Sequence, residues 1–216
     1  MCELLGLGAL TEIGAIRDRK SFAISSSYEA KNQPEAKMMN KIIWTLIALT
    51  TALSLTACTG KPNDITPVKN FQADKYLGTW YEIARLDNRF EKGLTQVSAT
   101  YRLRDDGGIS VLNRGYSRKN NEWKESLGKA YFVEDKNTAY LKVSFFGPFY
   151  GSYVVFDLDE NYQYSLVTGN DKTYFWLLAR TPTISGDVKA RLLEKATALG
   201  FDTTKLVFVE QTEAKQ

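Results

Sequence analysis

Cys58 is one of only two cysteines in a chain of 216 residues, and its thiol is the reactive group whose position is most informative. It follows an apolar run at residues 42–55, with Lys41 on the amino side and the small residues Thr56 and Ala57 directly before the thiol. A positive residue, a short apolar run and small residues at a break are the three parts of a secretory signal. The run is too short for a comfortable transmembrane helix, which needs about 20 apolar residues. We therefore expect cleavage in front of this cysteine.

The stretch Leu-Thr-Ala-Cys at residues 55–58 resembles the bacterial lipobox, in which the cysteine thiol is diacylated before cleavage. By that resemblance Cys58 is the lipid attachment site and the first residue of the mature protein. Thr59 stands where inner-membrane lipoproteins carry an aspartate, so the resemblance implies the bacterial outer membrane, facing the periplasm. The alternative is a buried cysteine in an apolar core helix, although nothing amphipathic surrounds the run.

These signals divide the chain into segments. Residues 1–37 precede a methionine where a signal can begin, and we interpret them as an over-extended N-terminus, with a genuine prefix as the alternative. Residues 38–57 form the predicted lipoprotein signal peptide. Residues 58–71, with glycine and prolines among polar residues, are predicted to be an acylated tether. Residues 72–216 are long enough for one domain with its own core.

The composition excludes several classes of function. The sequence contains no histidine, which removes the usual general base, the Ser-His and Cys-His nucleophile pairs and imidazole metal sites. We predict no catalytic residue, no metal site and no cofactor. A net charge of +3 without a dense Lys/Arg cluster gives no footprint for nucleic acid. Because Cys2 lies upstream of the expected cleavage and Cys58 is acylated, the mature fold is expected to lack a disulfide.

Beyond residue 71, short runs rich in Val, Ile, Tyr, Phe and Thr alternate with turn clusters. The clusters occupy residues 104–108, 119–121, 134–138, 159–162 and 169–172. This spacing predicts an antiparallel up-and-down meander, and hence a sandwich or a closed barrel. A helical period follows the last of these strands, with Ser185 as a candidate N-cap and Gly200 as its stop. Its apolar face carries Val188, Leu192, Ala196 and Leu199, and a final strand is predicted at 206–210.

Two motifs carry a resemblance to a known family. Residues 76–85, YLGTWYEIAR, resemble the Gly-x-Trp signature of lipocalins, and residues 175–185, FWLLARTPTIS, resemble their closing motif. Nearly everything from Phe71 to Glu210 follows the pattern, and with the lipobox the chain is similar to bacterial outer-membrane lipoprotein lipocalins, relatives of apolipoprotein D. The resemblance implies an all-β fold, an eight-stranded antiparallel up-and-down β-barrel (the lipocalin domain of 72–216) with a C-terminal α-helix packed outside and a short final strand.

The resemblance also assigns a structural plug to the closed end of the barrel. Trp80 is expected inside that end, covered by Arg180, whose planar guanidinium can stack on the indole and donate to nearby carbonyls. Gly78 lets the backbone pass closely.

Alternation along the strands then predicts which side chains face the interior. If Trp80 points inward, so do Glu82 and Ala84, and parity with Arg180 places Trp176 and Leu178 inside. The resemblance adds residues from the intervening strands. The predicted ligand-binding set is Glu82, Ala84, Tyr101, Asn113, Ala130, Leu141, Val143, Phe145, Trp176 and Leu178. The alternative is that these side chains simply fill a small barrel.

Two of the connections at the expected open mouth, residues 87–95 and 145–151, are unusually apolar for loops. They carry the predicted mouth residues Phe90, Phe146, Phe149 and Tyr150. Exposed aromatic clusters indicate contact with a lipid chain or a membrane surface, unless the rings pack on one another.

The sequence therefore predicts an outer-membrane-anchored lipocalin that binds and stores or transports lipids, namely fatty acids or lysophospholipids, without catalysis. Its partners are the lipid ligand and the membrane, through the acyl anchor, and no nucleic acid. The polar minority, Glu82, Tyr101 and Asn113, would orient the ligand. Two alternatives stay open: a structural or assembly lipoprotein of the envelope with an incidental cavity, and a lipid-modifying enzyme that uses a buried Glu82. The oligomeric state also stays open, a homodimer included.

Overall fold

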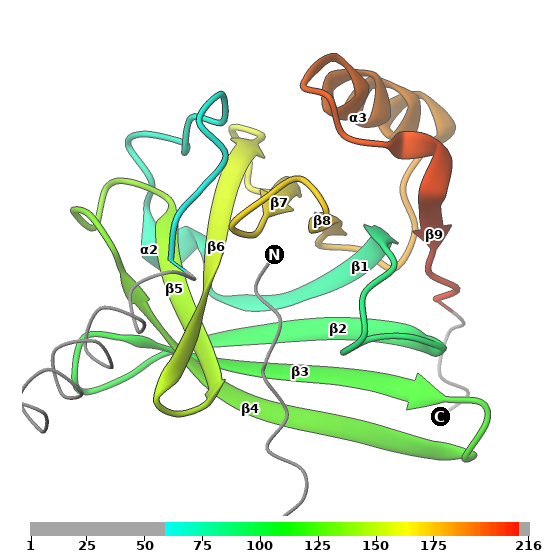
Figure 1. Cartoon of the computed structure of the whole chain (residues 1–216), viewed down its shortest axis with the longest axis horizontal. Helices are drawn as coiled ribbons and strands as arrows, with labels where there is room; N and C mark the ends of the chain where they lie inside the picture. Colours follow the sequence, from blue (N-terminus) through cyan, green and yellow to red (C-terminus); the bar gives the residue numbers. More distant parts are fainter. Residues whose placement is uncertain (1–58, 212–216) are drawn as a thin grey trace, which may run out of the picture. The chain divides into compact units, whose positions relative to one another are not determined.

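The computed structural model describes residues 59–211, so the predicted prefix, signal peptide and Cys58 lie outside the described residues. The described part is built from antiparallel strands that curve into a barrel (Figure 1). In chain order its elements are α2 (Ala73–Tyr76), β1 (Gly78–Leu86), β2 (Leu94–Leu103), β3 (Ile109–Ser117), β4 (Glu122–Phe132), β5 (Tyr140–Phe146), β6 (Phe149–Leu158), β7 (Tyr164–Thr168), β8 (Phe175–Ala179), α3 (Gly186–Ala198), a 3-10 turn (Thr203–Lys205) and β9 (Leu206–Phe208).

Strand β1 closes the barrel, because it pairs with β8 on one edge and with β2 on the other. From β2 to β8, every strand pairs with the next one in the sequence, which is the predicted up-and-down meander. β9 pairs with Ala84–Leu86, the part of β1 that extends past its pairing with β2. The predicted barrel, outer helix and short last strand are confirmed, and β9 ends at Phe208 rather than at Glu210.

The barrel has one apolar cluster inside it and a second one on its outer face. The outer cluster lies under α3, whose Leu192 and Ala196 are buried against the barrel wall. The predicted cap and stop of this helix are confirmed: the Ser185 side chain accepts a hydrogen bond from the Val188 amide, and Gly200 has a φ of +79° just past the end. The inner cluster surrounds the barrel axis and positions the site described below.

The segment predicted to be a tether packs on the barrel over most of its described length. Ile65 and Phe71 are almost fully buried. The backbone of Val68 donates to Val155 and accepts from Ala139, each at 2.9 Å. The glycine and prolines of this segment are therefore interspersed with apolar residues that pack on the barrel, and Phe71 belongs to the inner cluster.

Candidate ligand-binding cavity

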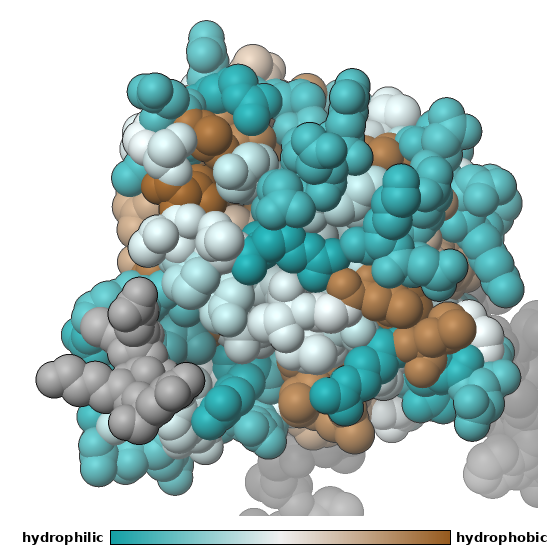
Figure 2. Space-filling model, turned by 180° about the vertical axis from the view of Figure 1, so that it is seen from behind, coloured by the Kyte–Doolittle hydropathy of each residue, from teal (hydrophilic) through white to brown (hydrophobic). Residues whose placement is uncertain are grey.

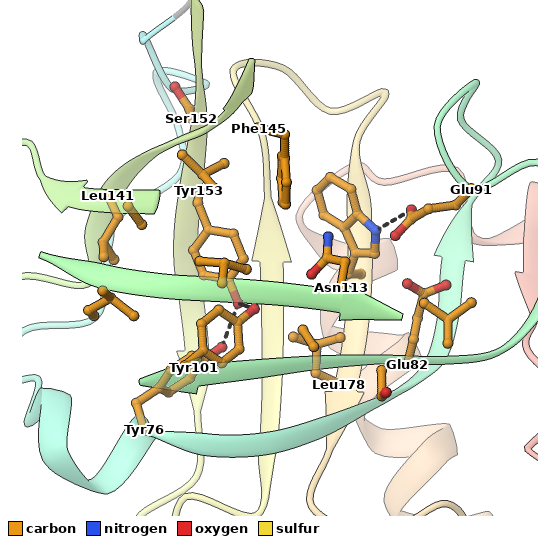
Figure 3. Close-up of a pocket in the computed structure, with 18 of the residues that line it drawn as sticks. Tyr76, Glu82, Glu91, Tyr101, Asn113, Leu141, Phe145, Ser152, Tyr153 and Leu178 are labelled. Atoms are coloured by element: carbon orange, nitrogen blue, oxygen red, sulfur yellow. Dashed lines mark hydrogen bonds between the residues drawn. The ribbon is translucent and has the colours of Figure 1, made fainter. Parts of the chain in front are cut away.

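A cavity of about 830 Å³, including the space at its open mouth, lies inside the barrel (Figure 3). Its walls are formed by β1 to β6 and β8, with additional side chains from α2 and from the β1–β2 loop. The apolar residues of the lining are Phe71, Val97, Ala99, Ile109, Val111, Ala130, Leu141, Val143, Phe145, Trp176 and Leu178.

Every residue of the predicted ligand-binding set except Ala84 lines this cavity. Gly128, opposite Phe145, shows why a small residue is needed on the β4 wall. A Cβ at Gly128 would lie 2.7 Å from the Phe145 ring and 2.8 Å from the Ser144 carbonyl oxygen. The aromatic ring therefore occupies the space that a side chain on β4 would take.

The prediction that Ala84 faces the cavity is wrong, because β1 contains a bulge at Ile83. Glu82 is paired with Leu178, but Ala84 is paired with Leu177 in the outer cluster. One extra residue reverses the alternation of faces for the rest of the strand. Arg85 therefore lies opposite Trp176 and turns inward in place of Ala84.

The bulge brings a buried ion pair to the cavity wall. Nη1 of Arg85 donates to Oε1 of Glu82 at 2.7 Å, and both side chains are at most 3% exposed. Nη2 of Arg85 donates to the backbone oxygen of Glu91 at 2.8 Å, which fixes the β1–β2 loop to the barrel. Arg85 and Glu91 are not among the site residues predicted from the sequence. Two opposite charges in the otherwise apolar stretch YEIARL are the signal that points to such a pair.

Glu91 extends a second carboxylate from the loop into this part of the cavity. Its Oε2 accepts from the indole N–H of Trp176 at 2.9 Å and from the amide of Asn88 at 2.6 Å. Burial, and then the Glu91 carboxylate, raise the pKa of Glu82 well above 4.5, against the opposing effect of Arg85. Within residues 59–211, no group of three or more side chains of the metal-ligating types could hold a metal ion.

The other end of the cavity carries a cluster of tyrosines. The hydroxyl of Tyr153 lies 2.8 Å from that of Tyr76 and 2.9 Å from that of Tyr101. Tyr76 also contacts the Ser165 hydroxyl at 3.1 Å. Burial raises the pKa of Tyr76 to about 12, and it raises the pKa values of Tyr101 and Tyr153 well above 10, so all three phenols are neutral donors near neutral pH.

Next to these tyrosines, Arg180 covers Trp80 at the closed end of the barrel, as expected. The Arg180 guanidinium carbon lies 4.1 Å from the centre of the Trp80 ring, and that indole is fully buried. Arg180 donates to the backbone oxygens of Thr79 at 3.0 Å, Lys75 at 2.6 Å and Tyr162 at 3.2 Å. Gly78 has a φ of +91°, and a Cβ there would lie 3.4 Å from Nη1 of the arginine.

The predicted mouth residues differ in exposure. Phe90, Phe146 and Phe149 are 63%, 75% and 59% exposed, so their rings are not buried against one another. Tyr150 is partly covered, with its ring 6.4 Å from that of Tyr131.

The face of the molecule in Figure 2 is mostly hydrophilic, with its hydrophobic residues gathered in separate patches. Across residues 59–211, no helix has the length and apolar character needed to span a membrane.

Comparison with known proteins gives a consistent result. The model of the lipocalin-like domain family matches residues 71–211. The chain is 57% identical over 158 residues to outer membrane lipoprotein Blc of Vibrio cholerae, covering 73% of this chain and 92% of the relative. It is 54% identical over 166 residues to outer membrane lipoprotein Blc of Escherichia coli K12, covering 76% and 94%.

Among solved structures, insecticyanin from the tobacco hornworm Manduca sexta superposes with a TM-score of 0.58. The match covers 72% of this chain and 88% of insecticyanin at 21% identity. This similarity supports the barrel architecture alone.

Proposed function

Because this chain belongs to the lipocalin-like family, we propose that it is an outer-membrane lipoprotein that binds single-chain lipids, such as fatty acids and lysophospholipids, in the cavity of its barrel. On this proposal it stores or transports the lipid within the cell envelope. Binding is non-covalent, and the protein acts as a carrier.

The observation that carries the proposal is the apolar-walled cavity inside the barrel. Aliphatic side chains of β3, β4 and β5 line the cavity, together with the rings of Phe145 and Trp176. Each methylene group that moves from water to such a wall contributes about 0.8 kcal/mol. An acyl chain can therefore supply most of the binding free energy, while the polar groups of the cavity restrict its orientation.

Localisation rests on the relatives and on the lipobox. The two bacterial relatives are named outer membrane lipoproteins, and Thr59 follows Cys58 here. We propose that Cys58 carries the acyl anchor and that the barrel faces the periplasm. The exposed rings of Phe90, Phe146 and Phe149 would then receive lipid from a membrane surface or a passing chain.

A carrier agrees better with the cavity than an enzyme does. Glu82 is the buried acid that a lipid-modifying enzyme would use, but its carboxylate is hydrogen-bonded to Arg85 at 2.7 Å. The sequence also contains no histidine to serve as a partner base. We therefore assign Glu82 and Arg85 to the wall of the cavity and to the attachment of the β1–β2 loop.

Native mass spectrometry of the full chain extracted from membranes tests the proposal. We expect the mature mass to begin at acylated Cys58 and to carry one additional single-chain lipid. Protein stripped of lipid should regain the mass of one added lysophospholipid or C16 fatty acid.

Two results would contradict the carrier function. Protein that is empty as isolated and takes up neither lipid would favour an envelope scaffold with an incidental cavity. Conversion of a lipid ester to product during incubation would indicate an enzyme. A preparation whose N-terminus is Met1 would overturn the assignment of Cys58 as the anchor.

A further inference from the structure

We propose that the tyrosine cluster at the closed end of the cavity is a hydrogen-bonding subsite for a neutral oxygen at the buried end of the ligand. The ligand class is a single-chain lipid whose chain ends in a hydroxyl or carbonyl oxygen. This inference rests on the proposed function, since it needs a chain bound along the barrel axis.

The position of the cluster makes it the floor of the cavity. Tyr101 is paired with Gly78, beside the plug, and the Tyr76 ring lies 4.6 Å from the ring of Trp80. Glu82 and Glu91 lie at the other side of the cavity (Figure 3). A chain that enters from the mouth passes the carboxylates first and reaches the tyrosines last.

The hydroxyls form an open chain rather than a closed ring. Ser165 contacts Tyr76, Tyr76 contacts Tyr153, and Tyr153 contacts Tyr101. Four hydroxyl groups bring four hydrogens, and the three contacts use three of them. Among the described residues, one hydrogen of this chain therefore has no acceptor within the cluster.

The two ends of the chain differ in their access to a ligand. Ser165 is fully buried and lies outside the cavity lining, whereas Tyr101, at the other end, lines the cavity, as do Tyr76 and Tyr153. When the hydrogen bonds run from Ser165 towards Tyr101, the spare donor belongs to Tyr101 and faces the cavity. In either direction the hydroxyls keep lone pairs that can accept a hydrogen bond from a ligand hydroxyl.

The surroundings favour a neutral group over a carboxylate. The Arg180 guanidinium is the nearby cation, but its hydrogens are directed to three backbone oxygens. Burying an ionised carboxylate against hydroxyls alone is expensive, whereas a hydroxyl or carbonyl oxygen can satisfy the spare donor and remain neutral.

Two probes of equal length test the subsite: 1-dodecanol, and 1,12-dodecanediol, which differs only by an oxygen at the second end. An oxygen buried against a purely apolar floor should weaken binding about 10- to 100-fold. With the subsite we expect the affinities of the two probes for the wild-type protein to agree within about threefold. The same comparison with C16 probes covers the case of a longer path to the floor.

Variants then assign the effect to the hydroxyls. Because more than one of the tyrosines can hold the spare donor, we use the double variant Tyr101→Phe/Tyr153→Phe, which removes two of the three phenol hydroxyls and keeps both rings. It should weaken the diol about tenfold relative to dodecanol. The matched control is Tyr116→Phe, whose ring lies against Trp123 on β3 and β4, outside the cavity. If the double variant is too unstable, the single variant Tyr153→Phe, which divides the hydroxyl chain, should show an intermediate ratio.

The outcomes separate this inference from the proposed function. A diol that binds at least tenfold more weakly than dodecanol to the wild type at both lengths would overturn the subsite while leaving the carrier function intact. The same holds for a ratio that the tyrosine variants do not change. If the wild-type protein binds none of the alcohol probes, no lysophospholipid and no fatty acid, the carrier function fails, and the subsite fails with it.

Discussion

Each end of the barrel places a tryptophan in contact with a charged side chain, but the partners differ in kind. At the closed end, Arg180 stacks on Trp80 and donates to backbone carbonyls. Towards the open end, the indole N–H of Trp176 donates to the carboxylate of Glu91. Nearby, Arg85 forms an ion pair with the carboxylate of Glu82.

This difference separates the end of the barrel that responds to pH from the end that does not. Backbone carbonyls do not titrate and do not move independently of the strands, so the closed end should behave in the same way at every pH near neutrality. The groups towards the open end are side chains with a raised pKa among them, and one of them is carried by a loop. We therefore expect a change of pH to act on the open end and to leave the plug unchanged.

The largest expected effect is the removal of Arg85. Arg85→Ala leaves the buried Glu82 carboxylate without its cation and next to Glu91, and the loss of one partner of a buried ion pair costs about 3–5 kcal/mol. At pH 8 we expect a loss of that size in the free energy of unfolding, measured by chemical denaturation. At pH 5 the loss should be smaller, because Glu82 can take up a proton.

A second variant sharpens this test. Replacing both partners, with Glu82→Leu and Arg85→Met, removes the charges together and should cost less than Arg85→Ala alone. An Arg85→Ala protein with the same stability loss at both pH values would contradict the assignment of a titrating partner.

The next effect belongs to the closed end. Arg180→Ala removes the stacked cation and leaves the carbonyls of the plug without their donor, which should lower the free energy of unfolding by roughly 1–3 kcal/mol. The loss should be the same at pH 5 and pH 8, and ligand affinity should change little. Arg191→Ala on the exposed face of α3 is the control. Unchanged stability with lost binding would move Arg180 into the ligand site.

The smallest expected effect concerns the pH dependence of stability. Because the pKa of Glu82 is raised in the folded state, the folded protein holds more protons than the unfolded chain above pH 4.5, and stability is lost as the pH rises through the raised pKa. Glu91→Gln removes a charge that raises this pKa, so the decline between pH 5 and pH 8 should become shallower. The exposed Glu160→Gln should leave the slope as it is. A slope unaffected by Glu91→Gln would show that burial alone sets this pKa.

The sequence predicted the regular part of the cavity well. Strand parity was sufficient for Trp176 and Leu178, because β8 runs without interruption beside β7. The same rule fails at Ala84, since an inserted residue at a bulge leaves no mark in a pattern of apolar side chains.

The polar groups of the cavity were harder to predict. Glu91 lies on a loop, where no periodicity relates a side chain to the barrel interior, and its role depends on Arg85 fixing that loop. Tyr153 lies on a strand whose face assignment requires the register of β5 and β6. Phe71 belongs to a stretch whose prolines and polar residues suggested a tether, although it packs inside the barrel.

Trp176 provides the most direct test of the claim that this cavity binds lipid. Its indole faces the cavity. The matched control is Trp123, which lies outside the cavity and is 41% exposed. The guanidinium carbon of Arg114 lies 3.9 Å from the centre of the Trp123 ring. The affinities of a C16 lysophospholipid and a C16 fatty acid are measured by titration. Trp176→Ala should lower both affinities about 10- to 100-fold, because it removes apolar contact worth roughly 1–3 kcal/mol. Trp123→Ala should leave both affinities unchanged. A folded Trp176→Ala protein that binds both lipids as tightly as the wild type would contradict the assignment of the cavity as the binding site.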